Sequence, residues 1–188
     1  MAARGITGIV SSLSDEALIL DFQRGSRPAF EELFARYREP LYGFFRRRLD
    51  NRERAEDLMQ EAFLAVIRAT VRHEPRALVR TYLYGIALKL LATERRKKST
   101  KDAPLEAGPE PKVDDASEDS VWVRQAIQKL DVPEREILML REYEQLSYSE
   151  IAELLRLPVN TVRSRLFRSR MALKNHLDPA GKMQNAHD

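Results

Sequence analysis

The sequence contains no cysteine among its 188 residues. Disulfides, a catalytic thiolate and cysteine metal sites are therefore excluded, and the absence fits a reducing compartment. No run approaches the roughly 18 uninterrupted apolar residues of a membrane-spanning helix, and the apolar stretch near the N-terminus is too short for a secretory signal. We therefore predict a cytoplasmic protein with no membrane insertion.

Glycine is also scarce, with seven residues, and alternating β-branched runs bounded by turn residues are absent. Such runs are the usual signature of strands and hairpins, whereas residues that favour helices dominate this sequence. The length and the hydrophobic content of 43% allow one or two small cores. We predict an all-α protein.

The sequence lacks an H-E-x-x-H pair, a phosphate-binding glycine loop and a nucleophile elbow. Glu53, Glu56, Asp57 and Glu61 recur at helical spacing and could bring carboxylates together for a metal-dependent nuclease. No second ligand-bearing element accompanies them, so this alternative is the least favoured. We predict that the protein is not an enzyme and has no catalytic residues, metal or cofactor.

The net charge of +3 is small, but its distribution is uneven. Residues 89–101 hold six Lys or Arg and one acid, whereas residues 102–119 hold seven acids, one base and three prolines. This acidic segment has almost no large apolar side chain and cannot bury enough surface to offset its ordering entropy. We predict a flexible acidic linker over 99–118.

Two small helical domains are expected on either side of this linker, over residues 14–98 and 119–177, with flexible tails at 1–13 and 178–188. In the first domain, Ser14 and Gly25 stand where the cap and the stop of a short helix are expected. Three longer helices should follow, from near residue 28, over about 52–69 and from 78 to about 98.

In the second domain, two pairs of residues match the capping box that opens a helix, Asp131 with Glu134 and Ser147 with Glu150. The last helix is expected from about 159 to 177. At about 100° per residue, its buried side is an apolar stripe with one serine. The members of this stripe are Val162, Leu166, Ser169, Leu173 and Leu177.

The opposite side of this last helix is polar, basic and aromatic. It presents Asn160, Ser164, Phe167, Arg168 and Met171, with Thr161, Arg163 and Arg165 along its flanks. A short capped helix, a turn and a longer basic helix match the helix-turn-helix, whose second helix enters the DNA major groove. Arginine there bonds phosphates or guanine, and Phe167 suits contact with a thymine methyl group. A solvated amphipathic helix is the alternative, but the capping box, the turn and the absence of acids favour DNA binding.

Four segments resemble bacterial sigma factors of the sigma-70 family, in the extracytoplasmic-function (ECF) group. LSYSEIAELLRLPVNTVRSRLFRSRMAL (146–173) resembles the promoter-binding region of this group, and VPEREILMLREYE (132–144) resembles the helix before it. AEDLMQEAFLAVIRA (55–69) resembles the polymerase-binding helix, and TYLYGIALKLLATERRK (81–97) the minus-10 recognition helix. The resemblance implies two domains, sigma region 2 and sigma region 4. It also implies a protein that directs core RNA polymerase to specific promoters and supports promoter melting.

The resemblance also implies site residues. Arg163, Ser164, Phe167 and Arg168 stand where the family reads the minus-35 element, and the helical wheel adds Asn160, Thr161 and Arg165 as DNA-binding candidates. The minus-10 candidates are His73, Glu74 and Arg76 in a loop that would hold a flipped base, followed by Tyr82, Lys89, Arg95 and Arg96.

The D-x-x-Q-E segment of the family is present as Asp57, Gln60 and Glu61. The resemblance implies that it docks on the clamp helices of the beta-prime subunit, and it implies the beta flap, promoter DNA and an anti-sigma factor as further partners. Carboxylates and an amide on one helix face suit charge-assisted bonds to a basic surface. A solvated acidic face with intrahelical pairs to Arg54 is the alternative.

The chain departs from the family pattern at Tyr82, Gly85, Lys89 and Thr93, so the preferred minus-10 base does not carry over. Tyr82 and Tyr84 are equally compatible with core packing. The alternative function is a free-standing helix-turn-helix regulator, which would bind duplex DNA tightly without polymerase, as a dimer on a two-fold site.

Overall fold

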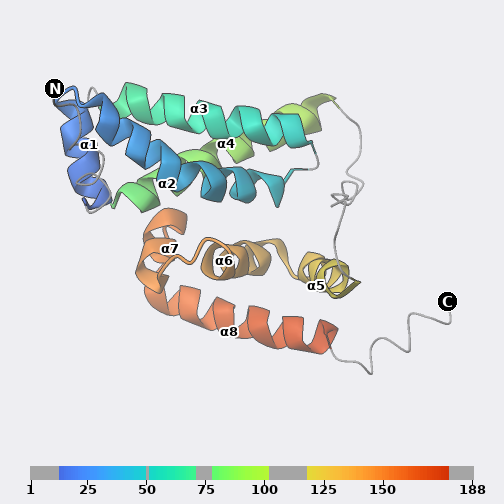
Figure 1. Cartoon of the computed structure of the whole chain (residues 1–188). Coiled ribbons are helices and arrows are strands. Elements are labelled where there is room, and N and C mark those ends of the chain that lie inside the picture. Colours follow the sequence, from blue (N-terminus) through green and yellow to red (C-terminus); the bar gives the residue numbers. More distant parts are fainter. Residues whose placement is uncertain (1–12, 50, 71–77, 102–117, 178–188) are drawn as a thin grey trace. The chain divides into compact units, whose positions relative to one another are not determined.

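The computed structural model describes residues 13–49, 51–70, 78–101 and 118–177. Within these residues the chain forms eight helices and no strand, which confirms the all-α prediction (Figure 1). The chain divides into two compact units, residues 1–111 with α1 to α4 and residues 112–188 with α5 to α8. No helix of the described part is long and apolar enough to cross a membrane.

The first unit opens with two helices whose ends follow the predicted signals. The N–H group of Ala17 donates to Ser14 Oγ at 3.2 Å, so Ser14 caps α1 (Asp15–Gln23). Gly25 has a φ of +95°, a conformation that costs other residues more, and the chain turns there into α2 (Arg27–Arg46). Both predicted signals are confirmed.

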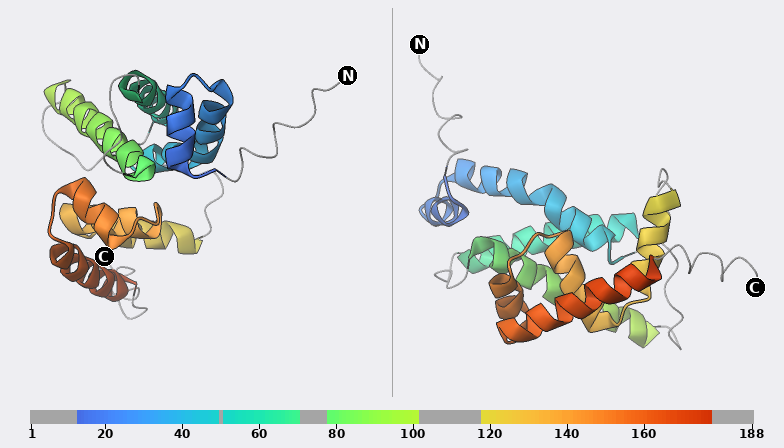
Figure 2. Two further views of the ribbon diagram at one scale, coloured as in Figure 1. Left: turned by 90° about the vertical axis from the view of Figure 1, so that its left-hand side faces the viewer. Right: turned by 90° about the horizontal axis from the view of Figure 1, so that it is seen from below.

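The core of the first unit lies between α2, α3 (Arg52–Thr70) and α4 (Val79–Lys101), with α1 packed against α2 and α4 (Figure 2). Phe44 and Phe45 of α2 are 0% exposed. The ring of Phe44 lies 5.6 Å from that of Tyr84 on α4, centroid to centroid. Tyr84 is therefore a core residue, so one of the two tyrosines left open by the sequence is assigned.

The second unit contains α5 (Glu118–Gln128), α6 (Val132–Glu142), α7 (Tyr148–Leu155) and α8 (Val159–His176). α6 packs against both α7 and α8. The capping box of α7 is formed, because the Ser147 N–H donates to Glu150 Oε2 at 2.7 Å and the Glu150 N–H donates to Ser147 Oγ at 3.2 Å. α7 ends at Arg156 in a left-handed conformation with a φ of 54°, which sets the turn into α8.

The other predicted capping box is wrong. Asp131 precedes α6, but its side chain makes no capping hydrogen bond. Glu134 instead accepts a hydrogen bond from Arg168 Nε at 3.1 Å. Both kinds of bond would be charge-assisted, but the bond to Arg168 joins two ionised groups, and it engages the Glu134 carboxylate in place of the cap.

Candidate nucleic-acid interface and partner surface

The helix α8 buries one side within the second unit and exposes the other. Val162, Leu166 and Ser169 are buried, at 0%, 1% and 0% exposure, whereas Leu173 and Leu177 are half-buried. The predicted stripe is thus confirmed at its first three positions. The burial of the stripe decreases toward the C-terminal end of α8.

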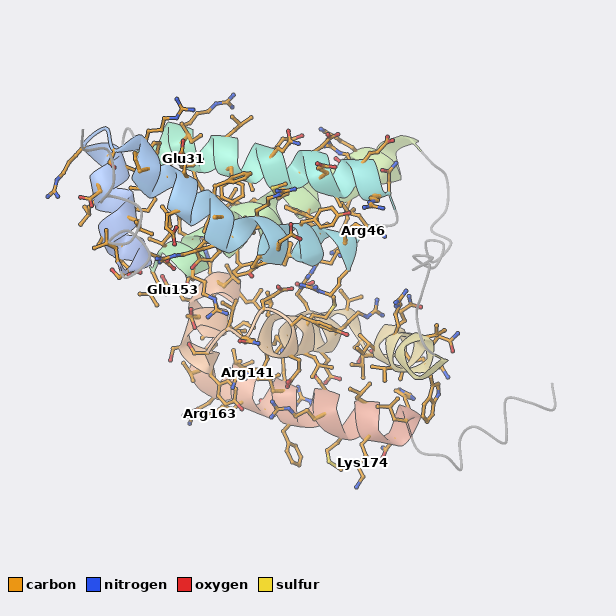
Figure 3. The ribbon with its side chains drawn as sticks, in the orientation of Figure 1. Glu31, Arg46, Arg141, Glu153, Arg163 and Lys174 are labelled. Atoms are coloured by element: carbon orange, nitrogen blue, oxygen red, sulfur yellow. The ribbon has the colours of Figure 1, made fainter. Side chains whose placement is uncertain are left out.

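The exposed side of α8 carries an aromatic ring between polar groups, and Arg163 and Lys174 mark its two ends in Figure 3. Phe167 is 67% exposed, and Met171, one turn further on, is 44% exposed. The Ser164 hydroxyl donates to the Thr161 carbonyl oxygen at 3.0 Å. A phenylalanine this exposed gains little stability from burial in its own domain, so the surface suits an external partner.

Arg168 is held in place by a carboxylate from α6. Its Nε lies 3.1 Å from Glu134 Oε1, and the two side chains are 60% and 18% exposed. Its terminal nitrogens have no hydrogen-bond partner within the described part of the chain. The guanidinium therefore has a fixed edge and a free end, and the free end can bond a guanine or a phosphate.

Arg170 has a different environment from Arg168. Its Nη2 lies 2.7 Å from Glu142 Oε1, and this contact raises the pKa of Arg170. The Ser169 hydroxyl lies 3.1 Å from the Glu134 carbonyl oxygen. These contacts join α8 to α6, so Arg170 contributes to the packing of these two helices in the second unit.

In the first unit, α4 presents a line of candidate residues two turns apart. Tyr82, Lys89 and Arg96 follow one another at intervals of seven residues, whereas Arg95 lies about 100° away around the helix. Lys89, Arg95 and Arg96 are exposed; Tyr82 is half-buried, and this burial raises its pKa. The structure thus aligns three of the four minus-10 candidates on α4. His73, Glu74 and Arg76 lie outside the described residues.

The acidic face of α3 presents Asp57, Gln60 and Glu61 at exposed positions, one helical turn apart. Arg54 lies among them, with its Nη1 at 3.1 Å from Glu61 Oε1 and 3.5 Å from Asp57 Oδ2. Hydrogen bonding to Glu94 of α4 raises the pKa of Arg54. No group of three acidic or histidine side chains in the described ranges could hold a metal ion.

Family models and related proteins match both units. Residues 33–100 match Sigma-70 region 2, and residues 120–173 match Sigma-70 region 4. The chain is 34% identical over 182 residues to the RNA polymerase sigma-H factor of Pseudomonas aeruginosa, covering 88% of this chain and 94% of that one. It is 32% identical over 184 residues to the ECF RNA polymerase sigma-E factor of Escherichia coli K12, covering 89% and 96%.

The chain belongs to the ECF sigma factors of the sigma-70 family. Solved structures share its fold. CnrH, in complex with the cytosolic domain of CnrY, matches with a TM-score of 0.65 and 22% identity over 93% of this chain and 99% of that one. RpoE of Bartonella quintana, in complex with the anti-sigma factor NepR, matches with a TM-score of 0.64 and 21% identity over 79% and 96%.

As an ECF sigma factor, the protein directs RNA polymerase to promoters and has no active site of its own. The match of both units to sigma regions rules against the free-standing regulator that the helix-turn-helix alone allowed. The sequence did not identify two carboxylates that bind arginines on the candidate surfaces, Glu94 with Arg54 and Glu134 with Arg168. Their partners lie 40 and 34 residues away. The sequence offered one indication of such a pairing, because Glu94 is the single acid among six Lys or Arg in residues 89–101.

Proposed function

We propose that α8 of this sigma factor reads the minus-35 element through its exposed side. The observation that carries the proposal is the exposed ring of Phe167 beside Arg168, whose Nε is held by Glu134. A guanidinium fixed at one edge loses less conformational freedom on binding DNA, which favours a base contact over a loose phosphate contact. Asn160, Thr161, Arg163, Ser164 and Arg165 would supply the surrounding contacts.

The first unit would take the melted minus-10 element. Tyr82, Lys89 and Arg96 lie along one line of α4, as a basic track with an aromatic platform requires for single-stranded DNA. Arg95 would contact the backbone from the neighbouring face. His73, Glu74 and Arg76 remain proposed as the pocket for a flipped base on the strength of the family resemblance.

The acidic face of α3 would dock on the beta-prime clamp helices of core polymerase, and the second unit on the beta flap. Asp57 and Glu61 have side chains that are 60% and 44% exposed, so both remain accessible to basic groups of a partner. We also propose an anti-sigma factor as a partner, because one solved neighbour is bound to such a protein.

Run-off transcription with core polymerase and a randomised promoter library tests the minus-35 proposal. The selected promoters should share a minus-35 sequence, and Phe167→Ala should weaken that selection while leaving the minus-10 preference unchanged. A mobility-shift measurement without polymerase should show weak binding to the same DNA. Selection of identical minus-35 sequences by the wild type and the variant would remove Phe167 from the reading surface.

A further inference from the structure

Arg54 divides its hydrogen bonds between two groups of carboxylates. Its Nε and Nη2 donate to the two carboxylate oxygens of Glu94 on α4, at 2.9 and 2.8 Å. The third nitrogen, Nη1, faces Glu61 at 3.1 Å and Asp57 at 3.5 Å, both on α3. One guanidinium therefore connects the minus-10 helix to two of the three residues of the proposed polymerase surface.

The exposure of these side chains separates an inner pair from an outer pair. Arg54 and Glu94 are 26% and 23% exposed, whereas Asp57 and Glu61 are 60% and 44% exposed. The bidentate bond to Glu94 is the stronger geometry and is also the better shielded from water. The contacts to Asp57 and Glu61 are single and solvated, so they are the ones that an incoming cation can replace.

We propose that Arg54 is an internal competitor of core polymerase for Asp57 and Glu61. In the free sigma factor it occupies the two carboxylates that the partner must bind. On docking it gives them up and keeps its two bonds to Glu94, so the guanidinium stays compensated. The inference rests on the proposed polymerase surface and adds a residue that lowers the affinity of that surface.

Competition predicts opposite effects for the two members of one ion pair. Removing the Arg54 charge leaves Asp57 and Glu61 available, so polymerase should bind more tightly. Removing the Glu94 charge leaves Asp57 and Glu61 as the carboxylates that Arg54 contacts in the described part of the chain, so Arg54 should hold them more strongly and polymerase should bind more weakly. A purely structural brace between α3 and α4 predicts instead that both changes lower stability and shift binding in the same direction.

The expected size follows from the strength of the contacts that Arg54 gives up. Breaking solvated ion pairs such as those to Asp57 and Glu61 changes an equilibrium constant by about 1.5- to 5-fold. Arg54→Gln should therefore tighten binding about threefold and Glu94→Gln should weaken it by a similar factor. Both effects should shrink as salt is raised, because exposed charges are screened.

The test measures the dissociation constant of the full-length sigma factor for core polymerase by fluorescence titration, at low and physiological salt. Arg27→Gln and Glu31→Gln are charge-matched controls, from an ion pair with side chains that are 88% and 62% exposed. Glu31 lies near the N-terminal end of α2, whereas Arg46 lies at its C-terminal end, after which the chain continues to α3 (Figure 3). These controls should leave the constant nearly unchanged. Arg54→Lys keeps the charge and should bind within about twofold of wild type, and melting curves report whether each variant folds.

A variant that combines Asp57→Asn with Glu61→Gln serves as a background. It distinguishes a failure of this inference from a failure of the proposed polymerase surface. The background alone should weaken binding, and Arg54→Gln added to it should bring no further gain. If the background binds polymerase as wild type does, the proposed surface and the inference both fail. If the background weakens binding but Arg54→Gln does not tighten it, or if the gain persists in the background, the inference alone is overturned.

Discussion

Arg168→Ala tests whether this sigma factor reads a base or only the backbone at the minus-35 element. The change removes a guanidinium whose Nε is held by Glu134 and whose terminal nitrogens are free within the described part of the chain. The side chain is 60% exposed and contributes little to packing, so the fold should remain intact. The effect should appear in promoter use.

A bidentate arginine–guanine pair contributes about 1 to 3 kcal/mol of discrimination, which is about 5- to 150-fold in promoter use. If Arg168 bonds only a phosphate, the same change weakens binding to all sequences alike and lowers the salt dependence by about one unit of slope. The two outcomes differ in which DNA sequences are bound more weakly. If Arg168 reads a base, only binding to the preferred sequence is weakened.

Two neighbouring changes serve as matched comparisons. Glu134→Gln keeps an acceptor for Arg168 Nε but removes the charge, so binding to all DNA should rise slightly while discrimination falls. Arg170→Ala removes an arginine that bonds Glu142 at 2.7 Å, but both side chains are about half exposed, so it should lower the free energy of unfolding by no more than about 1 kcal/mol and leave promoter preference unchanged. Each change thus affects a different quantity.

The assay is run-off transcription with core polymerase on the selected promoter and on each single substitution in its minus-35 element. Arg168→Ala should reduce the difference in transcription between the four bases at one minus-35 position and leave the differences at the other positions as in wild type. An equal reduction on every template would refute base reading and assign Arg168 to phosphate. Reduced discrimination in Arg170→Ala as well would show that the fold of the second unit, not the side chain, is responsible.

Three further changes test other parts of the structure. Phe167→Ala should alter the free energy of unfolding by no more than about 0.5 kcal/mol, because the ring is 67% exposed, while reducing transcription from the selected promoter. Ser147→Ala removes the capping box of α7 and should cost about 1 kcal/mol in denaturant unfolding. Burial and the hydrogen bond to Asp15 raise the pKa of Tyr37, so its contribution to stability is complete below about pH 10 and is lost as the pH rises further. The alkaline fall in melting temperature should accordingly be shallower for Tyr37→Phe.

Local signals in the sequence predicted most of the helices correctly. Ser14, Gly25, Ser147 and Glu150 act within four residues of their partners, so spacing alone was sufficient to place these helix ends. The outward position of Phe167 followed from helical periodicity for the same reason. Tyr84 is buried against Phe44 whereas Tyr82 is half-buried, and periodicity within α4 did not separate them.

Ion pairs between distant helices were not predicted. The sequence places Glu134 three residues after Asp131, which favours a cap, but tertiary packing brings Arg168 to the same carboxylate. Intrahelical pairing of Arg54 was the alternative for the acidic face, and Arg54 does contact Asp57 and Glu61 on α3, yet its bidentate bond goes to Glu94 on another helix. Spacing rules describe neighbours on one helix and carry no information on which helices will meet.

These ion pairs change how the charge of α8 acts on DNA. The helix has five cations, Arg163, Arg165, Arg168, Arg170 and Lys174, but Arg168 and Arg170 are paired with carboxylates of α6. Each cation that neutralises a phosphate adds sequence-independent affinity, so pairing two of five lowers the attraction to every DNA sequence alike. The contacts of Phe167 with bases are unaffected by this pairing. Since competing genomic sites vastly outnumber promoters, a subunit that polymerase carries to DNA gains specificity when its own non-specific affinity is low.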